Sequence, residues 1–284
     1  MPKAEGGRTV TSNGVALRRQ WRLQSNEQEH HMSEIIEVEV DGAIRTVTLN
    51  RPEKRNALNS EMLTELHAAF SGEPSADERV AVVRASGPVF CAGLDLRERE
   101  EGLPGGDVSI EQMLDAIQHW PLPVVAVVQG DAIAGGNELA LHCDFVVADV
   151  EARFGMSLAQ IGLAPSWFLA KKLLEVAGPV ATKEILLLGD RIPAWRMHEW
   201  GVIARVANAE ELEEAAEAVI DRLSRNAPLS LRAMKALIVR EMDFRDHIPH
   251  EDVDELVAAA RSSNDAKEGI RALFERRPPA FRGE

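Results

Sequence analysis

Cysteine is scarce in this sequence and long apolar runs are missing, and each shortage excludes a class of protein. Only Cys91 and Cys143 occur among 284 residues. Two isolated thiols neither form a disulfide framework nor show the spacing of metal ligands, so the sequence predicts a reducing, cytoplasmic setting and no metal site. Apolar runs are strand-sized, as in Val124–Val128. A membrane-spanning helix needs roughly 20 apolar residues, so no membrane span is predicted.

Basic residues are outnumbered by acidic ones. The chain has 32 Lys and Arg against 46 Asp and Glu, which gives a formal net charge of −14 at pH 7. Such a chain repels polyanions overall, and no basic stripe with interleaved aromatic residues appears, so nucleic acid is not expected as a partner. A small ligand that carries phosphates would have to meet a local basic patch.

The composition is otherwise that of a globular protein, except at the N-terminus. Hydrophobic residues make up 45% of the chain, and 284 residues can bury one large domain or a domain plus an appendage. Residues 1–31 are polar and show no apolar period. They predict a disordered N-terminal extension.

The first half of the chain alternates between strand and helix patterns. Residues 35–40 and 44–49 alternate apolar and polar side chains around the turn signal Asp41-Gly42, which predicts a β-hairpin. A helix is predicted to start at Asn59 or Ser60, and a short one at 137–142 follows a glycine-rich loop. Further strands are predicted at residues 80–85, 123–129 and 144–148.

These patterns give an α/β fold class. Strand, glycine-rich loop and helix recur in unequal lengths, which favours repeated strand–strand–helix turns over a doubly wound nucleotide fold. After about residue 165 the pattern is almost entirely helical. The predicted helices there cover residues 169–176, 179–188, 210–225, 228–240, 249–262 and 266–276.

Four motifs in order resemble a known family. They are Asn50-Arg51-Pro52 with Asn56-Ala57-Leu58, then Cys91-Ala92-Gly93-Leu94-Asp95-Leu96, Ala134-Gly135-Gly136-Asn137-Glu138-Leu139-Ala140, and Phe154-Gly155. Together they resemble the crotonase superfamily, the enoyl-CoA hydratase/isomerase family, from about residue 35 to 281. The resemblance implies a spiral of ββα repeats over residues 32–225 and a helical trimerisation region over 226–284. It also implies a homotrimer or a hexamer, and an acyl-coenzyme A thioester as substrate with no separate cofactor.

The two glycine loops could polarise a thioester carbonyl. Backbone N–H groups aimed at the carbonyl oxygen stabilise an enolate, and glycine lets the backbone approach without a side-chain clash. Gly135 also precedes a predicted helix, where free N–H groups favour negative charge. The family pattern assigns the two donors to Leu94 and Gly135. The plainer interpretation is that both loops are ordinary tight turns.

The proton-transfer groups depart from the family pattern. Glu138, near one helical turn after Gly135, matches one of the two catalytic glutamates of the hydratases that the chain resembles. The second position falls on Leu158, which cannot transfer a proton. Five other polar side chains are candidate substitutes, although each is more simply explained as a surface or core residue: Glu111, His142, Ser157, Gln160 and Ser166.

The remaining candidates concern the coenzyme A moiety and the acyl pocket. The basic residues near the family's ligand loops are expected to meet phosphates, and Trp167 is expected to shape the acyl pocket. The full set of predicted contacts, besides the catalytic Glu138, Gly135 and Leu94, is Lys54, Arg55, Ala57, Ala92, Asp95, Arg97, Leu158, Trp167 and Arg276.

The sequence therefore predicts hydration of a 2-enoyl-CoA through an enolate. Leu158 weakens that prediction and leaves enoyl-CoA isomerisation, acyl-CoA decarboxylation or thioester hydrolysis with a single glutamate as alternatives. A non-catalytic acyl-CoA-binding subunit is the alternative outside enzymes.

Overall fold

The computed structural model describes residues 31–32, 35–100 and 107–284. Residues 1–30, which make up nearly all of the predicted N-terminal extension, lie outside this part. A seven-stranded mixed sheet in the order β1-β2-β3-β4-β5-β7-β10 forms the centre, and a small second sheet has the order β6-β8-β9. The strands are β1 (His31–Met32), β2 (Ile36–Asp41), β3 (Ile44–Leu49), β4 (Val80–Ala85), β5 (Val124–Val128), β6 (Ala132–Ile133), β7 (Phe145–Asp149), β8 (Arg153–Gly155), β9 (Ile192–Pro193) and β10 (Arg205–Ala207).

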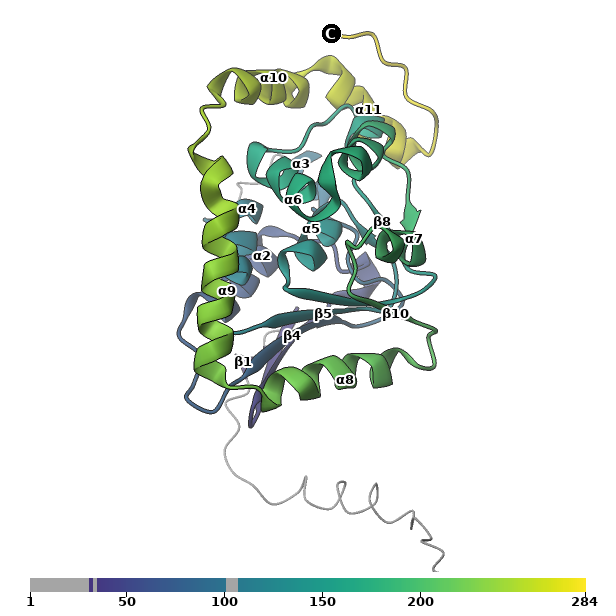
Figure 1. The fold of residues 1–284 in the computed structure, drawn as a ribbon. Helices are drawn as coiled ribbons and strands as arrows, with labels where there is room; N and C mark the ends of the chain where they lie inside the picture. The colour runs from purple at the N-terminus through teal and green to yellow at the C-terminus, as the bar shows by residue number, and fades with distance from the viewer. Residues whose placement is uncertain (1–30, 33–34, 101–106) are drawn as a thin grey trace, which may run out of the picture.

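Helices cover both faces of the large sheet (Figure 1). Helix α8 lies along one face, and α2, α4, α5 and α6 lie on the other, while α9 runs along one side towards α10 and α11. The helices are α2 (Ser60–Ser71), α3 (Leu96–Glu100), α4 (Ile110–His119), α5 (Gly135–His142), α6 (Trp167–Lys183), α7 (Ala194–Glu199), α8 (Leu212–Arg225), α9 (Pro228–Met242), α10 (Glu251–Ser262) and α11 (Asn264–Glu275). No helix of the described residues is long and apolar enough to cross a membrane.

The central strands are apolar on both sides because both sides are covered. In β4, Val80 and Val82 pack towards α8, whereas Ala81 and Val83 belong to the larger core beneath α2, α4 and α5. Successive strand side chains point to opposite faces, so a buried parallel strand reads as a continuous apolar run. The mixed α/β architecture predicted from the sequence is confirmed.

The predicted hairpin and most of the longer helices are present. Strands β2 and β3 pair antiparallel around Asp41 and Gly42, as the turn signal indicates. The Asn59 side chain caps α2 by accepting the Met62 N–H at 3.0 Å. The helices predicted at 169–176 and 179–188 meet at Gly178, which has non-helical angles of φ 68° and ψ 172°. The chain continues from there through a π-helical turn, Glu184–Leu188.

The short elements were not predicted. Strands β6, β8, β9 and β10 have two or three residues each, and α7 has only six. Such elements are too short to show a period. The division of the chain at residue 225 into a core and a C-terminal region stays a prediction.

Candidate active site

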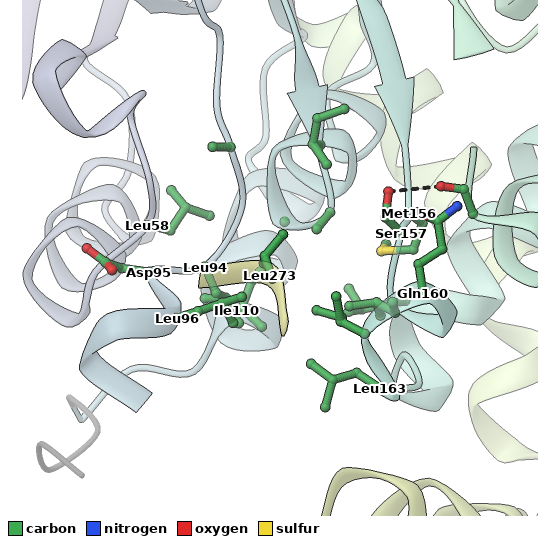
Figure 2. Close-up of a pocket in the computed structure, with 18 of the residues that line it drawn as sticks. Leu58, Leu94, Asp95, Leu96, Ile110, Met156, Ser157, Gln160, Leu163 and Leu273 are labelled. Carbon is green, nitrogen blue, oxygen red and sulfur yellow. Dashed lines mark hydrogen bonds between the residues drawn. The ribbon is translucent and has the colours of Figure 1, made fainter. Parts of the chain in front are cut away.

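A cavity of about 800 Å³ opens where the predicted ligand loops meet the segment after β8. Figure 2 shows Leu58, Leu94 and Asp95 on one wall, and Ser157 and Gln160 on the opposite one. Arg261 of α10 and Leu273 of α11 complete the lining. Most of the lining side chains are apolar, which is typical of pockets that bind small organic molecules.

Backbone hydrogen bonds tie the two loops of the first wall together. The Leu58 N–H donates to Gly93 O at 2.8 Å, and the Asp95 N–H donates to Leu58 O at 2.9 Å. Arg51 Nη1 forms an ion pair with Asp95 Oδ2 at 2.8 Å. The buried Asn56 amide donates to two backbone carbonyls of the loop that precedes Phe90. The loop 91–95 is therefore held in place by the loop 51–58.

The same loop lies directly against the start of α5. A Cβ added to Gly93 would lie 3.1 Å from the Gly135 nitrogen and 2.9 Å from Ile133 O. Within the described part of the chain, neither the Leu94 N–H nor the Gly135 N–H donates to a protein acceptor. Both residues line the cavity. Two free backbone donors thus stand at neighbouring loops, as required to bind one carbonyl oxygen.

Ala134 adopts a backbone conformation that L-residues rarely take. Its angles are φ 50° and ψ −116° at the N-cap of α5. Its own N–H donates to Gly155 O at 2.7 Å, which holds the turn against β8. Strained backbone of this kind costs of order 1–3 kcal/mol and is characteristic of functional sites. The strain here sets the direction of the next amide, that of Gly135.

Glu138 does not line the cavity. Its side chain is fully buried, and neither carboxyl oxygen has a hydrogen-bond partner within the described residues. Burial raises the pKa of the Glu138 carboxyl to about 8, and the nearby Lys172 ammonium offsets only part of this effect. The predicted catalytic role of Glu138 is not tested by this geometry, but the side chain lies behind the wall and not on it.

His142 and the cysteines are equally enclosed. The His142 Nδ1 lies 3.8 Å from Glu138 Oε2, yet burial holds the pKa of His142 well below its usual value, so the contact is not an ion pair. Its Nδ1 instead bonds the Glu138 carbonyl at 2.8 Å, and its ring stacks on Phe168. Burial also raises the pKa of Cys91 and of Cys143 to about 12. Neither thiol ionises near neutral pH.

The position of the second family glutamate lies in the cavity wall. Leu158 lines the cavity and immediately precedes the 3-10 turn Ala159–Ile161. Ser157 donates to Gly189 O, and Gln160 donates to Leu188 O, so both are engaged in fixing the wall. Trp167 is not part of the lining; its ring stacks on His250 with 4.6 Å between centroids.

The structure brings only some of the predicted coenzyme A contacts to the cavity. Of the predicted set, Arg55, Ala92, Asp95 and Leu158 line it, and Asp95 is already paired with Arg51. The remaining members lie off the cavity wall: Lys54 and Arg97 are exposed, Ala57 is half-buried, and Arg276 is exposed where it ends α11.

Several lining residues were not anticipated from the sequence. Asp131 and Arg191 both line the cavity and pair at 2.9 Å, and the C-terminal helices contribute Arg261 and Leu273. Asp131 precedes the unpredicted two-residue strand β6, and the others lie far along the chain, so no local signal marks them. Among the described residues there is no group of three or more His, Cys, Asp and Glu side chains able to hold a metal ion.

Comparison with known proteins shows that this chain is similar in sequence to acyl-CoA enzymes. The sequence pattern of the enoyl-CoA hydratase/isomerase family matches residues 39–284. A putative enoyl-CoA hydratase of Thermus thermophilus is 36% identical over 252 residues, which cover 84% of this chain and 98% of that protein. A carnitinyl-CoA dehydratase of Salmonella heidelberg is 32% identical over 89% of this chain and all of its own length.

Solved structures of acyl-CoA enzymes have the same fold as this chain. A methylmalonyl-CoA decarboxylase superposes with a TM-score of 0.81 at 26% identity, covering 89% of this chain and 100% of that one. An enoyl-CoA hydratase from Mycobacterium avium subsp. paratuberculosis superposes with a TM-score of 0.75 at 28% identity, covering 87% of this chain and 98% of that one.

Proposed function

Because the chain belongs to the enoyl-CoA hydratase/isomerase family and is a crotonase-type acyl-CoA enzyme, we propose that it adds water to a 2-enoyl-CoA thioester. The reaction passes through an enolate whose oxygen accepts hydrogen bonds from the Leu94 and Gly135 N–H groups. The coenzyme A thioester is itself the substrate, and no separate cofactor takes part.

The observation that carries the proposal is the pair of free donors at the cavity. Leu94 and Gly135 belong to loops that touch at Gly93, and both face the cavity. Hydrogen bonds to the thioester oxygen draw electron density away from the conjugated β-carbon, which opens it to attack by water, and they stabilise the negative charge that collects on the oxygen as water adds. Losing one such donor typically costs on the order of 3 kcal/mol of activation free energy.

The lining supports an apolar acyl group with a phosphate-bearing end. Leu63, Ile110, Met156 and Leu169 belong to the cavity wall, and burying each methylene of an acyl chain on such a surface contributes about 0.8 kcal/mol. Arg55 is the exposed basic residue of the lining beside the first loop. In a chain of net charge −14, it would draw the coenzyme A phosphates locally.

Isomerisation of a 3-enoyl-CoA is the second candidate, and Leu158 favours it. A shift of a double bond needs one group that removes a proton and returns it, whereas hydration is helped by two groups that divide this work. Leu158 occupies the wall where the second glutamate is expected. A relative 30% identical over 86% of this chain, from Streptococcus mutans, is a trans-2-decenoyl-[acyl-carrier-protein] isomerase.

One spectrophotometric assay separates the two reactions. Hydration of crotonyl-CoA removes the absorbance of the conjugated thioester, while isomerisation of 3-hexenoyl-CoA creates it. We expect the first signal with the wild-type protein and several 2-enoyl chain lengths. Tight binding of these esters without turnover of either type would contradict the proposed reaction. It would favour the alternative that the chain is a non-catalytic acyl-CoA-binding subunit.

Assembly and location are also proposed. Exposed apolar side chains on α9, α10 and α11 support a homotrimer, alone or paired into a hexamer. The cytoplasmic location predicted from two unpaired cysteines stays a prediction, and both thiols are free and buried.

A further inference from the structure

Carboxyl groups are unexpected in a cavity wall that is otherwise mostly apolar, and four of the five that line it serve to hold the wall. Each of the four has a partner on a neighbouring segment. The pairs are Asp95 with Arg51, Asp131 with Arg191, Glu98 with Ser60, and Asp190 with Gln160. The fifth carboxyl group, that of Glu111, is held differently.

Glu111 has one neutral partner and a second oxygen that faces no protein donor. Its side chain is half-buried, and Oε1 accepts a hydrogen bond from the Ser166 hydroxyl at 2.9 Å. No donor among the described residues reaches Oε2. A capping box between Ser109 and Gln112 fixes the first turn of α4, which carries Glu111. The carboxylate is therefore held in place with one oxygen left for a ligand in the cavity.

The position of Glu111 is on the acyl side of the carbonyl trap. Its neighbour Ile110 lies against the trap, because a Cβ on Gly135 would be 2.9 Å from Ile110 Cδ1. Its partner Ser166 closely follows Leu163, another residue of the lining. A thioester whose carbonyl is bound at Gly135 would thus have Ile110 beside its first acyl carbons and Glu111 beside the carbons further along.

A carboxylate at this place selects against a plain alkyl chain. Such a chain would remove water from Oε2 and offer no hydrogen bond in return, and the loss of hydration weakens binding. An acyl group with a hydrogen-bond donor replaces the water that it displaces. Sites built to bind a substrate hydroxyl reject the analogue without it strongly, because their own polar group is then left unpaired.

The nearby charge favours a neutral donor over a cation. Arg261 lines the cavity, and its Nε donates to Ala164 O at 3.0 Å, two residues before the Ser166 that holds Glu111. A positive charge attached to the same short segment opposes the binding of an ammonium group beside Glu111. A hydroxyl group has no such penalty.

We propose, in an inference that rests on the proposed function, that Glu111 determines the specificity of the acyl pocket and selects 2-enoyl-CoA esters with a hydroxyl group beyond Cβ. The hydroxyl donates a hydrogen bond to Glu111 Oε2, while Ser166 holds Oε1. Glu111 recognises the acyl group in this way and moves no proton to or from the reacting carbons. The predicted acid/base role stays with Glu138.

The test compares esters in which a hydroxyl group replaces a terminal methyl group. One pair is 4-hydroxy-2-butenoyl-CoA and 2-pentenoyl-CoA, and the other is 5-hydroxy-2-pentenoyl-CoA and 2-hexenoyl-CoA. The wild-type kcat/KM for hydration should favour the hydroxyl ester of at least one pair by about tenfold or more. Glu111→Leu should abolish this preference, mainly by lowering kcat/KM for the hydroxyl ester. Glu111→Gln, which keeps an oxygen acceptor, should retain part of it.

A matched control lies one turn along the same helix. Asp115 is exposed, lies outside the cavity lining and pairs with His119, so Asp115→Asn should keep the wild-type preference. A folded Glu111→Leu variant that loses activity equally on both members of each pair would overturn the inference, because a structural or proton-transfer role predicts that result.

The wild-type protein separates the inference from the proposed function. Equal hydration of both members of both pairs would overturn the selection of a hydroxyl group and leave the proposed function standing. Absence of turnover with all four esters would overturn the proposed function. The dissociation constants of the same esters would then decide the inference, and equal constants within each pair would overturn it as well.

Discussion

At the scale of single residues, the site depends on which carboxyl groups face the cavity. Sequence spacing places Glu138 one helical turn from Gly135, but the structure turns its side chain into the protein interior, beside His142 and behind the wall. A buried carboxyl without hydrogen bonds is costly in its charged form. The pKa of Glu138 is accordingly raised to about 8.

Glu138 should make the stability of the protein depend on pH. The folded state keeps this proton at pH values where the unfolded chain, with a pKa near 4.5, has lost it. The free energy of unfolding therefore falls as pH rises from about 4.5 to about 8, by on the order of 1.4 kcal/mol for each pH unit at most.

Glu138→Gln removes this dependence. In urea unfolding, we expect the free energy of unfolding of the variant, relative to that of the wild type, to rise by a few kcal/mol from pH 5 to pH 9. His142, whose pKa is lowered by burial, also makes the free energy of unfolding depend on pH in the acidic range. Both proteins contain this histidine, so its contribution cancels in the difference. A stability difference that stays constant over this pH range would show that Glu138 is not held protonated.

Leu158 offers the complementary test. Because Leu158 lines the cavity, Leu158→Glu adds a second carboxylate where the family pattern expects one. We predict that kcat/KM for crotonyl-CoA hydration rises by about tenfold or more, since a positioned acid or base contributes about 10²–10⁴. Leu158→Gln, which matches the size but transfers no proton, is the control, and an equal gain in both variants would exclude a proton-transfer origin.

At the scale of elements, close approach between the loop 91–95 and helix α5 brings together the Leu94 and Gly135 N–H groups, which form the proposed carbonyl trap. Helix α5 starts so near the loop 91–95 that a Cβ on Gly136 would lie 2.2 Å from Cys91 O. The contact atom is backbone, so no side-chain rotation relieves it. The loop 91–95 also pairs with β6 through an isolated β-bridge between Cys91 and Ala132. Gly136 therefore serves packing, beside the proposed carbonyl-binding role of Gly135.

Gly136→Ala should separate α5 from this loop. We predict a loss of about 3 kcal/mol in the free energy of unfolding, as in overpacked cores, and a fall in activity that exceeds the fall in folded protein. Gly72→Ala is the matched control, because nothing lies within 4 Å of a Cβ at Gly72. Equal stability of the two variants in urea titration would contradict the packing role of Gly136.

The sequence predicts the repetitive parts of the fold better than the site. The hairpin and α2 follow from period and capping, and the positions of Leu94 and Gly135 follow from the motifs. The direction of a side chain on a short helix such as α5 depends on how the helix is rotated against its neighbours, so the burial of Glu138 could not be read from spacing. The hydrogen bond from Ser166 to Glu111 joins residues 55 positions apart, which no local pattern encodes.

At the scale of the whole molecule, the C-terminal helices leave apolar surface uncovered. Leu237 on α9 is 65% exposed and Leu256 on α10 is 70% exposed. Soluble monomers rarely expose extended patches of such residues. Helix α10 also contributes Arg261 to the cavity lining, and the next helix, α11, contributes Leu273. The proposed interface and the candidate site therefore share one part of the chain.

Light scattering should give a mass of three or six times the 31.2 kDa chain. Leu256→Asp, which places a charge on the proposed interface, should shift the mass towards that of the monomer. Glu217→Arg on the exposed face of α8 reverses a charge elsewhere and should leave the mass unchanged. A wild-type protein that remains monomeric at micromolar concentration would contradict the predicted trimer.

The most direct test of the account is the vibrational frequency of the thioester carbonyl of bound crotonyl-CoA, isolated by ¹³C labelling at C1. If the Leu94 and Gly135 N–H groups bind that oxygen, the carbonyl stretch should fall on binding, by more than it does when the free ester moves from an apolar solvent into water. A carbonyl frequency equal to that of the ester in water, measured with the protein saturated, would contradict the carbonyl trap on which the proposed function rests.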